Sequence, residues 1–86
     1  MDFYADWCGP CKVIEPVIAQ LSKEYMGKVK FVKIDTDANQ DLAMQFGIMS
    51  IPTVMFFAHG KVEDIVVGAV PASIFKTKLD SLVKKA

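Results

Sequence analysis

Arginine is absent from this sequence, histidine occurs once and cysteine only twice. Ten lysines balance ten acidic residues, so the formal net charge is zero. Nucleic-acid binding would call for a basic excess that contacts phosphates, and a polybasic anchor or an acidic tail would need a similar imbalance. The even charge therefore predicts no nucleic-acid partner.

Long apolar runs are also missing. None approaches the roughly 20 residues that a membrane span needs, and Met1 is followed by Asp2 rather than by a basic, apolar leader. We therefore expect no membrane partner and a cytoplasmic location. The 86 residues suffice for a single domain, 1–86, and 52% of them are hydrophobic, which permits a dense core.

The spacing of apolar residues predicts seven elements. Strands are expected at residues 2–5, 29–35, 53–58 and 61–67, and helices from Pro10 to about Gly27, over 40–46 and after Pro71. The first two strands, joined by a helix, should be parallel with a right-handed crossover. The turn at His59 and Gly60 should make the last two strands an antiparallel hairpin. The fold class is therefore α/β, with a mixed four-stranded sheet in the order β-α-β-α-β-β-α and helices on both faces.

Cys8 and Cys11 form a Cys-x-x-Cys pair at the start of the first predicted helix. There, unpaired backbone N–H groups and the helix dipole favour a thiolate at Cys8. Cys11 follows one turn later, close enough to close a small ring. Such a pair carries out thiol–disulfide exchange as a redox-active disulfide, with no separate cofactor. The spacer, Gly9 and Pro10, adds no charge that would stabilise the reduced form further, so we predict a reductant.

Metal binding is the competing interpretation of the same cysteines. A structural zinc site needs four ligands, and the sequence offers two cysteines and His59, which is predicted to lie in a distant hairpin turn. Zinc would therefore need a second chain, and we predict no metal. Met44, Met49 and Met55 lie on different predicted elements, so we expect them to fill the core rather than to bind a soft metal. For Met49, which lies on the loop before Ile51, the alternative is an exposed position near the substrate.

The stretch Asp-Phe-Tyr-Ala-Asp-Trp-Cys-Gly-Pro-Cys-Lys, from Asp2 to Lys12, resembles the active-site signature of the thioredoxin family. Lys33, the run Ile51-Pro52-Thr53 and Gly68 follow in the family's order, so the resemblance covers essentially the whole chain. It implies a thioredoxin-like fold and an enzyme, a protein-disulfide reductase that acts on disulfide-containing target proteins. It further implies a monomer that is recharged by thioredoxin reductase, or alternatively by a glutaredoxin-type system, and that serves electron transport and cell redox homeostasis.

The resemblance assigns catalytic roles to four residues. Cys8 corresponds to an exposed attacking thiol, and Cys11 to a buried thiol that resolves the mixed disulfide. Asp2 matches a buried carboxylate behind Cys11 that takes its proton, and a carboxyl held in an apolar strand can act as such a base. Lys33 resembles the ammonium near that carboxylate. The alternatives are a solvated Asp2 and a strand lysine that reaches solvent.

The resemblance also implies a substrate-binding surface around Cys8. Pro52 matches the family's cis-proline, whose geometry places the backbone of Ile51 beside the cysteines. An extended substrate segment can pair with that backbone, as in strand addition. The surface would be apolar and would consist of Trp7, Gly9, Pro10, Ile51, Pro52, Val67, Gly68 and Ala69.

The sequence departs from the family pattern at its beginning, because the family's first strand and helix do not appear before residues 2–5. Two explanations are a naturally reduced form, close in layout to glutaredoxin, and a start site downstream of the true one. In either case residues 29–35 should form a sheet edge, which is open to self-association. Two further functions compete with the reductase: a non-catalytic interaction module and a specialised, glutaredoxin-like electron donor.

Overall fold

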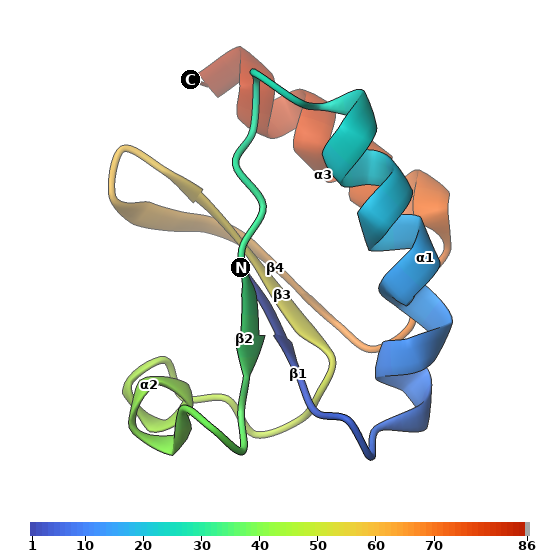
Figure 1. The fold of residues 1–86 in the computed structure, drawn as a ribbon. Helices are drawn as coiled ribbons and strands as arrows, with labels where there is room; N and C mark the ends of the chain where they lie inside the picture. The colour runs from blue at the N-terminus through green and yellow to red at the C-terminus, as the bar shows by residue number, and fades with distance from the viewer. Residues whose placement is uncertain (86) are drawn as a thin grey trace.

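Seven elements follow one another in the order that the sequence predicts (Figure 1). The computed structural model describes residues 1–85. None of the helices in this range is long and apolar enough to cross a membrane. The elements are β1 (Asp2–Tyr4), α1 (Gly9–Glu24), β2 (Lys33–Asp35), α2 (Gln40–Gln45), β3 (Thr53–Ala58), β4 (Lys61–Val67) and α3 (Ala72–Lys85).

The four strands form one mixed sheet in the order β2-β1-β3-β4. As predicted, β1 pairs in parallel with β2, and β3 and β4 form an antiparallel hairpin. β1 also pairs antiparallel with β3 and so lies inside the sheet. In Figure 1, α1 and α3 run along one side of the sheet and α2 lies on the other. The α/β fold class is therefore confirmed.

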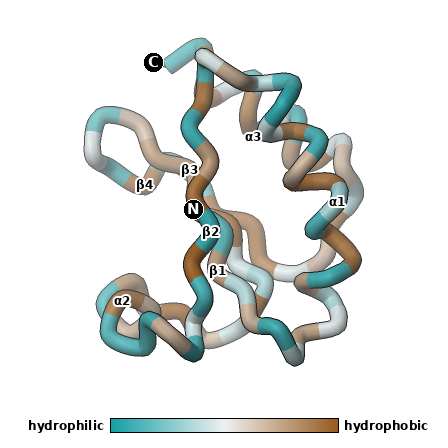
Figure 2. Tube along the Cα trace, viewed as in Figure 1, coloured by the Kyte–Doolittle hydropathy of each residue, from teal (hydrophilic) through white to brown (hydrophobic). Residues whose placement is uncertain are grey.

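The main core fills the space between the sheet and the two long helices. Along α1 and α3, apolar and polar residues alternate with the helical period, and Figure 2 shows this as brown and teal patches. The buried residues of this core are Ile14, Ile18, Leu21, Tyr25, Val54, Phe56, Ala58, Val66, Phe75, Leu79 and Leu82. On the other face, the ring of Phe46 contacts Phe3 and Phe57, with centroids 5.9 and 5.8 Å apart. Both faces of β3 are thus covered, as its apolar run predicts.

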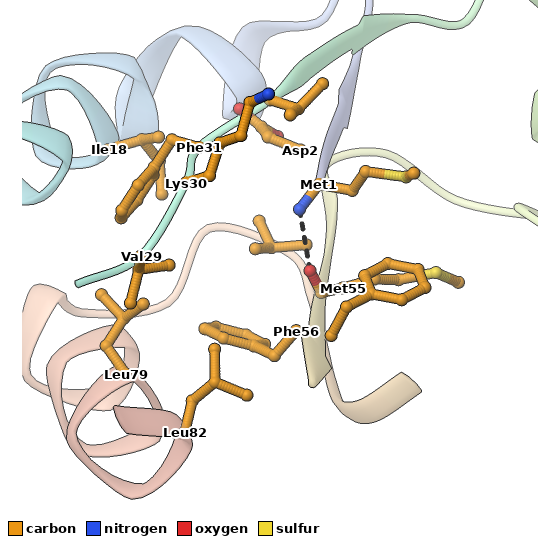
Figure 3. A pocket seen from close by; sticks show the side chains of 13 residues that line it. Met1, Asp2, Ile18, Val29, Lys30, Phe31, Met55, Phe56, Leu79 and Leu82 are labelled. Atoms are coloured by element: carbon orange, nitrogen blue, oxygen red, sulfur yellow. Dashed lines mark hydrogen bonds between the residues drawn. The ribbon is translucent and has the colours of Figure 1, made fainter. Parts of the chain in front are cut away.

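The second strand is shorter than the sequence predicts, because only Lys33–Asp35 of the range 29–35 is strand. Its partner β1 has three residues, which pair with these three, so the preceding residues have no complete ladder to join. They border an apolar cavity of about 260 Å³ between the sheet, α1 and α3. Figure 3 shows Phe31, Phe56 and Leu79 around this cavity.

The predicted core role of the methionines holds for one of three. Met55 is buried in β3, whereas Met44 is 77% exposed and Met49 is 96% exposed. Met44 lies on helix α2, which has only six residues and buries none of them. Met49 lies in the loop that connects α2 to β3. The core prediction is therefore wrong for Met44, and for Met49 the alternative of an exposed position holds.

Candidate active site

Cys8 and Cys11 are joined by a disulfide at the start of α1, with Cα atoms 5.3 Å apart. Cys8 is the N-cap residue and has extended backbone angles, φ −85° and ψ 108°. Its sulfur accepts a hydrogen bond from the backbone N–H of Cys11 at 3.2 Å. Pro10 occupies the first turn, where a missing N–H costs the helix no bond. The helix terminus therefore directs an N–H group at the sulfur of Cys8, where it stabilises negative charge.

Both cysteines are buried, with 3% of Cys8 and 6% of Cys11 exposed. The expectation of an exposed Cys8 is therefore wrong for the disulfide form of the protein. The reason is packing, because the disulfide forms a small apolar cluster with Ala5, against which Tyr4 and Ile51 pack. Exposure does not distinguish the two sulfurs, but the backbone does, since only Cys8 has the N-cap position.

The loop before β3 lies beside Cys8. The peptide bond between Ile51 and Pro52 is cis, as the resemblance implies. The carbonyl oxygen of Ile51 is 3.8 Å from the sulfur of Cys8. At the end of β4, the backbone N–H of Gly68 donates to the carbonyl of Pro52 at 2.9 Å. Two segments that are distant in sequence are thus brought together next to the disulfide.

The surface residues expected around Cys8 are a mixture of exposed and half-buried groups. Trp7 is 70% exposed and Val67 is 57% exposed. Gly9, Pro10 and Ala69 are exposed, Ile51 and Gly68 are half-buried and Pro52 is buried. Met49, two residues before Ile51, is exposed on this loop, as its alternative interpretation predicts, and adds an apolar side chain there. The surface that these residues offer is largely apolar.

The indole of Trp7 is held by a residue that sequence reasoning missed. Its Nε1–H donates to the Asp37 carboxylate at 2.8 Å. Asp37 lies in the turn after β2, where its backbone N–H donates to the side chain of Asp35 at 2.9 Å. No local signal in the sequence links positions 7 and 37, since they meet only through the pairing of β1 with β2.

Asp2 is 7% exposed, which excludes the solvated alternative. Within residues 1–85, its Oδ1 has no hydrogen-bond partner. Burial raises the pKa of the Asp2 carboxyl; the Lys33 ammonium and the Met1 terminus oppose this, and the carboxylate of Glu15 adds to it. Asp2 is therefore a carboxyl that holds its proton more readily than an exposed aspartate.

Lys33 lies directly opposite Asp2 in the parallel ladder. Its ammonium is 4.6 Å from the ring centroid of Tyr4, a cation–π distance. Lys33 is exposed, as the alternative of a strand lysine that reaches solvent predicts. Lys33 reaches solvent, and it still acts electrostatically on Asp2.

Metal ligands do not gather anywhere in residues 1–85, because no group of three or more His, Cys, Asp or Glu residues lies close enough to hold an ion. His59 is in the hairpin turn, where its Nε2 is 3.2 Å from the carbonyl oxygen of Lys85.

A cysteine pair at the head of a helix is suited to exchange because one sulfur is activated and the other lies within bonding distance of it. The pair is closed as a disulfide here, and a backbone carbonyl and an apolar surface lie beside it. The fold and this site together define a thiol–disulfide oxidoreductase.

The comparison with protein families points the same way. The family model Thioredoxin matches residues 1–81. The chain is 52% identical over 85 residues to a thioredoxin of Synechocystis sp., covering 99% of this chain and 76% of the relative. It is 48% identical over 85 residues to Thioredoxin 1 of Nostoc sp., with the same coverage. It is 47% identical over 83 residues to a chloroplastic M-type thioredoxin of Pisum sativum.

The chain belongs to the thioredoxin family. The match to the Pisum sativum protein covers 96% of this chain and 48% of that relative, so the chain spans about half of the relative's length.

Proposed function

We propose that the protein reduces disulfides in target proteins through Cys8 and Cys11. The Cys8 thiolate attacks one sulfur of the target disulfide and releases the other as a thiol. Cys11 then attacks the sulfur of Cys8 in the mixed disulfide, which forms the intramolecular disulfide and releases the second target thiol. Two electrons pass from the protein to the target, and the disulfide seen here is the oxidised product.

The observation that carries this proposal is the position of Cys8 as the N-cap of α1. Its sulfur receives the N–H of Cys11, so the attacking group is stabilised as an anion by a bond that the fold supplies in advance. No acidic residue lies in the first turn of α1 to oppose this effect. Cys11 lacks an equivalent terminal position and is suited to the resolving step.

Target recognition is proposed to rest on backbone and apolar contact. An extended target segment would lie along Ile51 and the end of β4, with its disulfide beside the Cys8 sulfur. The exposed side chains of Trp7 and Val67 support this, because they offer apolar area without fixed charges. Such a surface suits many partners rather than one sequence.

Asp2 is proposed to act as a base for Cys11, with Lys33 tuning its charge. The burial of Asp2 and the direction of its pKa shift support this role.

We further propose that a thioredoxin reductase recharges the disulfide, and that the protein works as a cytoplasmic monomer without nucleic-acid or membrane partners. The formal net charge of zero supports the absence of a nucleic-acid partner.

Equilibration of the Cys8–Cys11 couple with glutathione buffers tests the direction of transfer. We expect a potential more negative than the cytosolic glutathione poise of about −220 to −260 mV, because the Gly9-Pro10 spacer does not stabilise the reduced form. The fraction of oxidised protein, read from the tryptophan fluorescence of the single Trp7, gives the equilibrium constant. A potential well above that range would indicate an oxidase or an isomerase instead.

A further inference from the structure

A polar cavity of about 120 Å³ lies beside the resolving cysteine. Residues from three segments of the chain border it, among them Tyr4, Asp6, Cys11, Lys12, Glu15 and Lys33. Four of these, Asp6, Lys12, Glu15 and Lys33, are exposed, so the cavity reaches solvent. Cys11 itself is only 6% exposed. The cavity therefore extends from beside Cys11 to the surface residues that border it.

Glu15 borders the same cavity as Cys11. It follows Cys11 by four residues on α1, so the two side chains lie on the same face of the helix. Both border the cavity, whereas Asp2 borders the separate apolar cavity of Figure 3. Glu15 and Cys11 thus share a polar cavity that Asp2 does not border.

We propose that Glu15 accepts, across this cavity, the proton that Cys11 loses when it resolves the mixed disulfide. In this step the sulfur of Cys11 bonds to that of Cys8, and the bond between Cys8 and the target sulfur breaks. The target leaves with the electron pair and takes a proton from solvent. The Cys11 proton passes to Glu15 and then to solvent. This inference rests on the proposed reductase function and adds a second acceptor to Asp2.

The charges around Glu15 come from every side of the cavity. Lys12 lies on the same helix, Asp6 lies in the loop after β1, and the titratable phenol of Tyr4 comes from β1 itself. Lys33 comes from β2, and Asp2 with the Met1 terminus lies nearby in the sheet. The carboxylate of Glu15 adds to the raised pKa of Asp2, whose main cause is burial.

At position 15, a proton acceptor and a negative charge that accepts no proton have opposite effects on the rate of resolution by Cys11. Removing the negative charge of Glu15 would by itself ease the formation of a Cys11 thiolate and speed resolution. Removing a proton acceptor would slow resolution. The Glu15→Gln variant separates these roles, because glutamine keeps the size and the helix propensity of glutamate but is neither charged nor basic.

Single-turnover reaction of the reduced protein with one equivalent of Ellman's reagent follows both steps. Attack by Cys8 releases one thionitrobenzoate, and resolution by Cys11 releases the second. For Glu15→Gln we expect an unchanged first release and a second release that is roughly tenfold slower near neutral pH. Glu24→Gln is the matched control, since it makes the same change on the same helix beside Lys76, and both its releases should keep the wild-type rates.

Glu15→Asp retains a carboxylate and should restore part of the lost rate. An unchanged or faster second release in Glu15→Gln would overturn the proposal, as would an equal slowing of both releases. Failure of the proposed function gives a different result, because the wild-type protein would then not accelerate the reduction of insulin by dithiothreitol, whatever the rates of the two releases. A urea unfolding curve for each variant shows that the compared proteins are folded.

Discussion

Replacement of Cys8 by serine is expected to reduce insulin disulfide reduction to the rate of dithiothreitol alone. A serine hydroxyl at the N-cap can still accept the N–H of Cys11, so the helix should form normally. It is not ionised near neutral pH and cannot form the mixed disulfide. The loss therefore measures the chemistry of the sulfur and not the stability of the fold. Turbidity from precipitating insulin chains follows the reaction.

Cys11→Ser is the companion variant, because it removes only the resolving step. Cys8 should still attack, so the target remains attached through a disulfide that survives denaturing electrophoresis and is released by excess dithiothreitol. A wild-type rate in Cys8→Ser would exclude the proposed enzyme. Capture of targets that depends on neither cysteine would instead support the interaction module.

Replacement of Asp2 by asparagine is expected to stabilise the protein at neutral and alkaline pH. Burial raises the pKa of Asp2 in the folded state above its ordinary value near 3.8. The Asp2 carboxyl therefore stabilises the folded state at pH values below its ordinary pKa, where it is protonated. This stabilisation is lost as the pH rises through the raised pKa of the folded state. Above it, the native state holds a desolvated charge, and Oδ1 has no partner within residues 1–85. Asparagine removes this charge, and the gain should be about 1–3 kcal/mol.

Urea unfolding at several pH values measures this gain. The difference between Asp2→Asn and the wild type should be small near pH 3 and grow toward pH 8. Asp41→Asn is a matched control, because Asp41 is exposed at the start of α2 and should lose a little helix-terminal stabilisation instead. A destabilised Asp2→Asn at pH 8, or a difference that does not change with pH, would contradict a raised pKa.

Much of the fold follows from local patterns in the sequence. The bounds of β3 and β4 match their apolar run and turn residues, and the first helix is signalled by Pro10 and by the 3–4 spacing of Ile14, Ile18 and Leu21. The cysteine pair could be found because its chemistry needs only a helix start and a spacing of three. The cis bond at Pro52 came from the family resemblance, since few bonds before proline are cis.

What could not be predicted depends on contacts between distant segments. Asp37 reaches Trp7 only because β1 and β2 are in parallel register. The shortening of β2 follows from the length of its partner, and the burial of Cys8 follows from its packing with Ala5 and Ile51. The spacing of Glu15 from Cys11 was present in the sequence, but the cavity that both border is a property of three packed segments.

The central claim is that the N-terminus of α1 activates the sulfur of Cys8. The rate of alkylation of the reduced protein by iodoacetamide, measured against pH with mass spectrometry to assign the modified cysteine, tests it most directly. We predict that Cys8 is alkylated first and that its rate reaches half of its maximum clearly below about pH 8.5, the value for a free cysteine. A half-point at or above that pH, or preferential alkylation of Cys11, would contradict the claim.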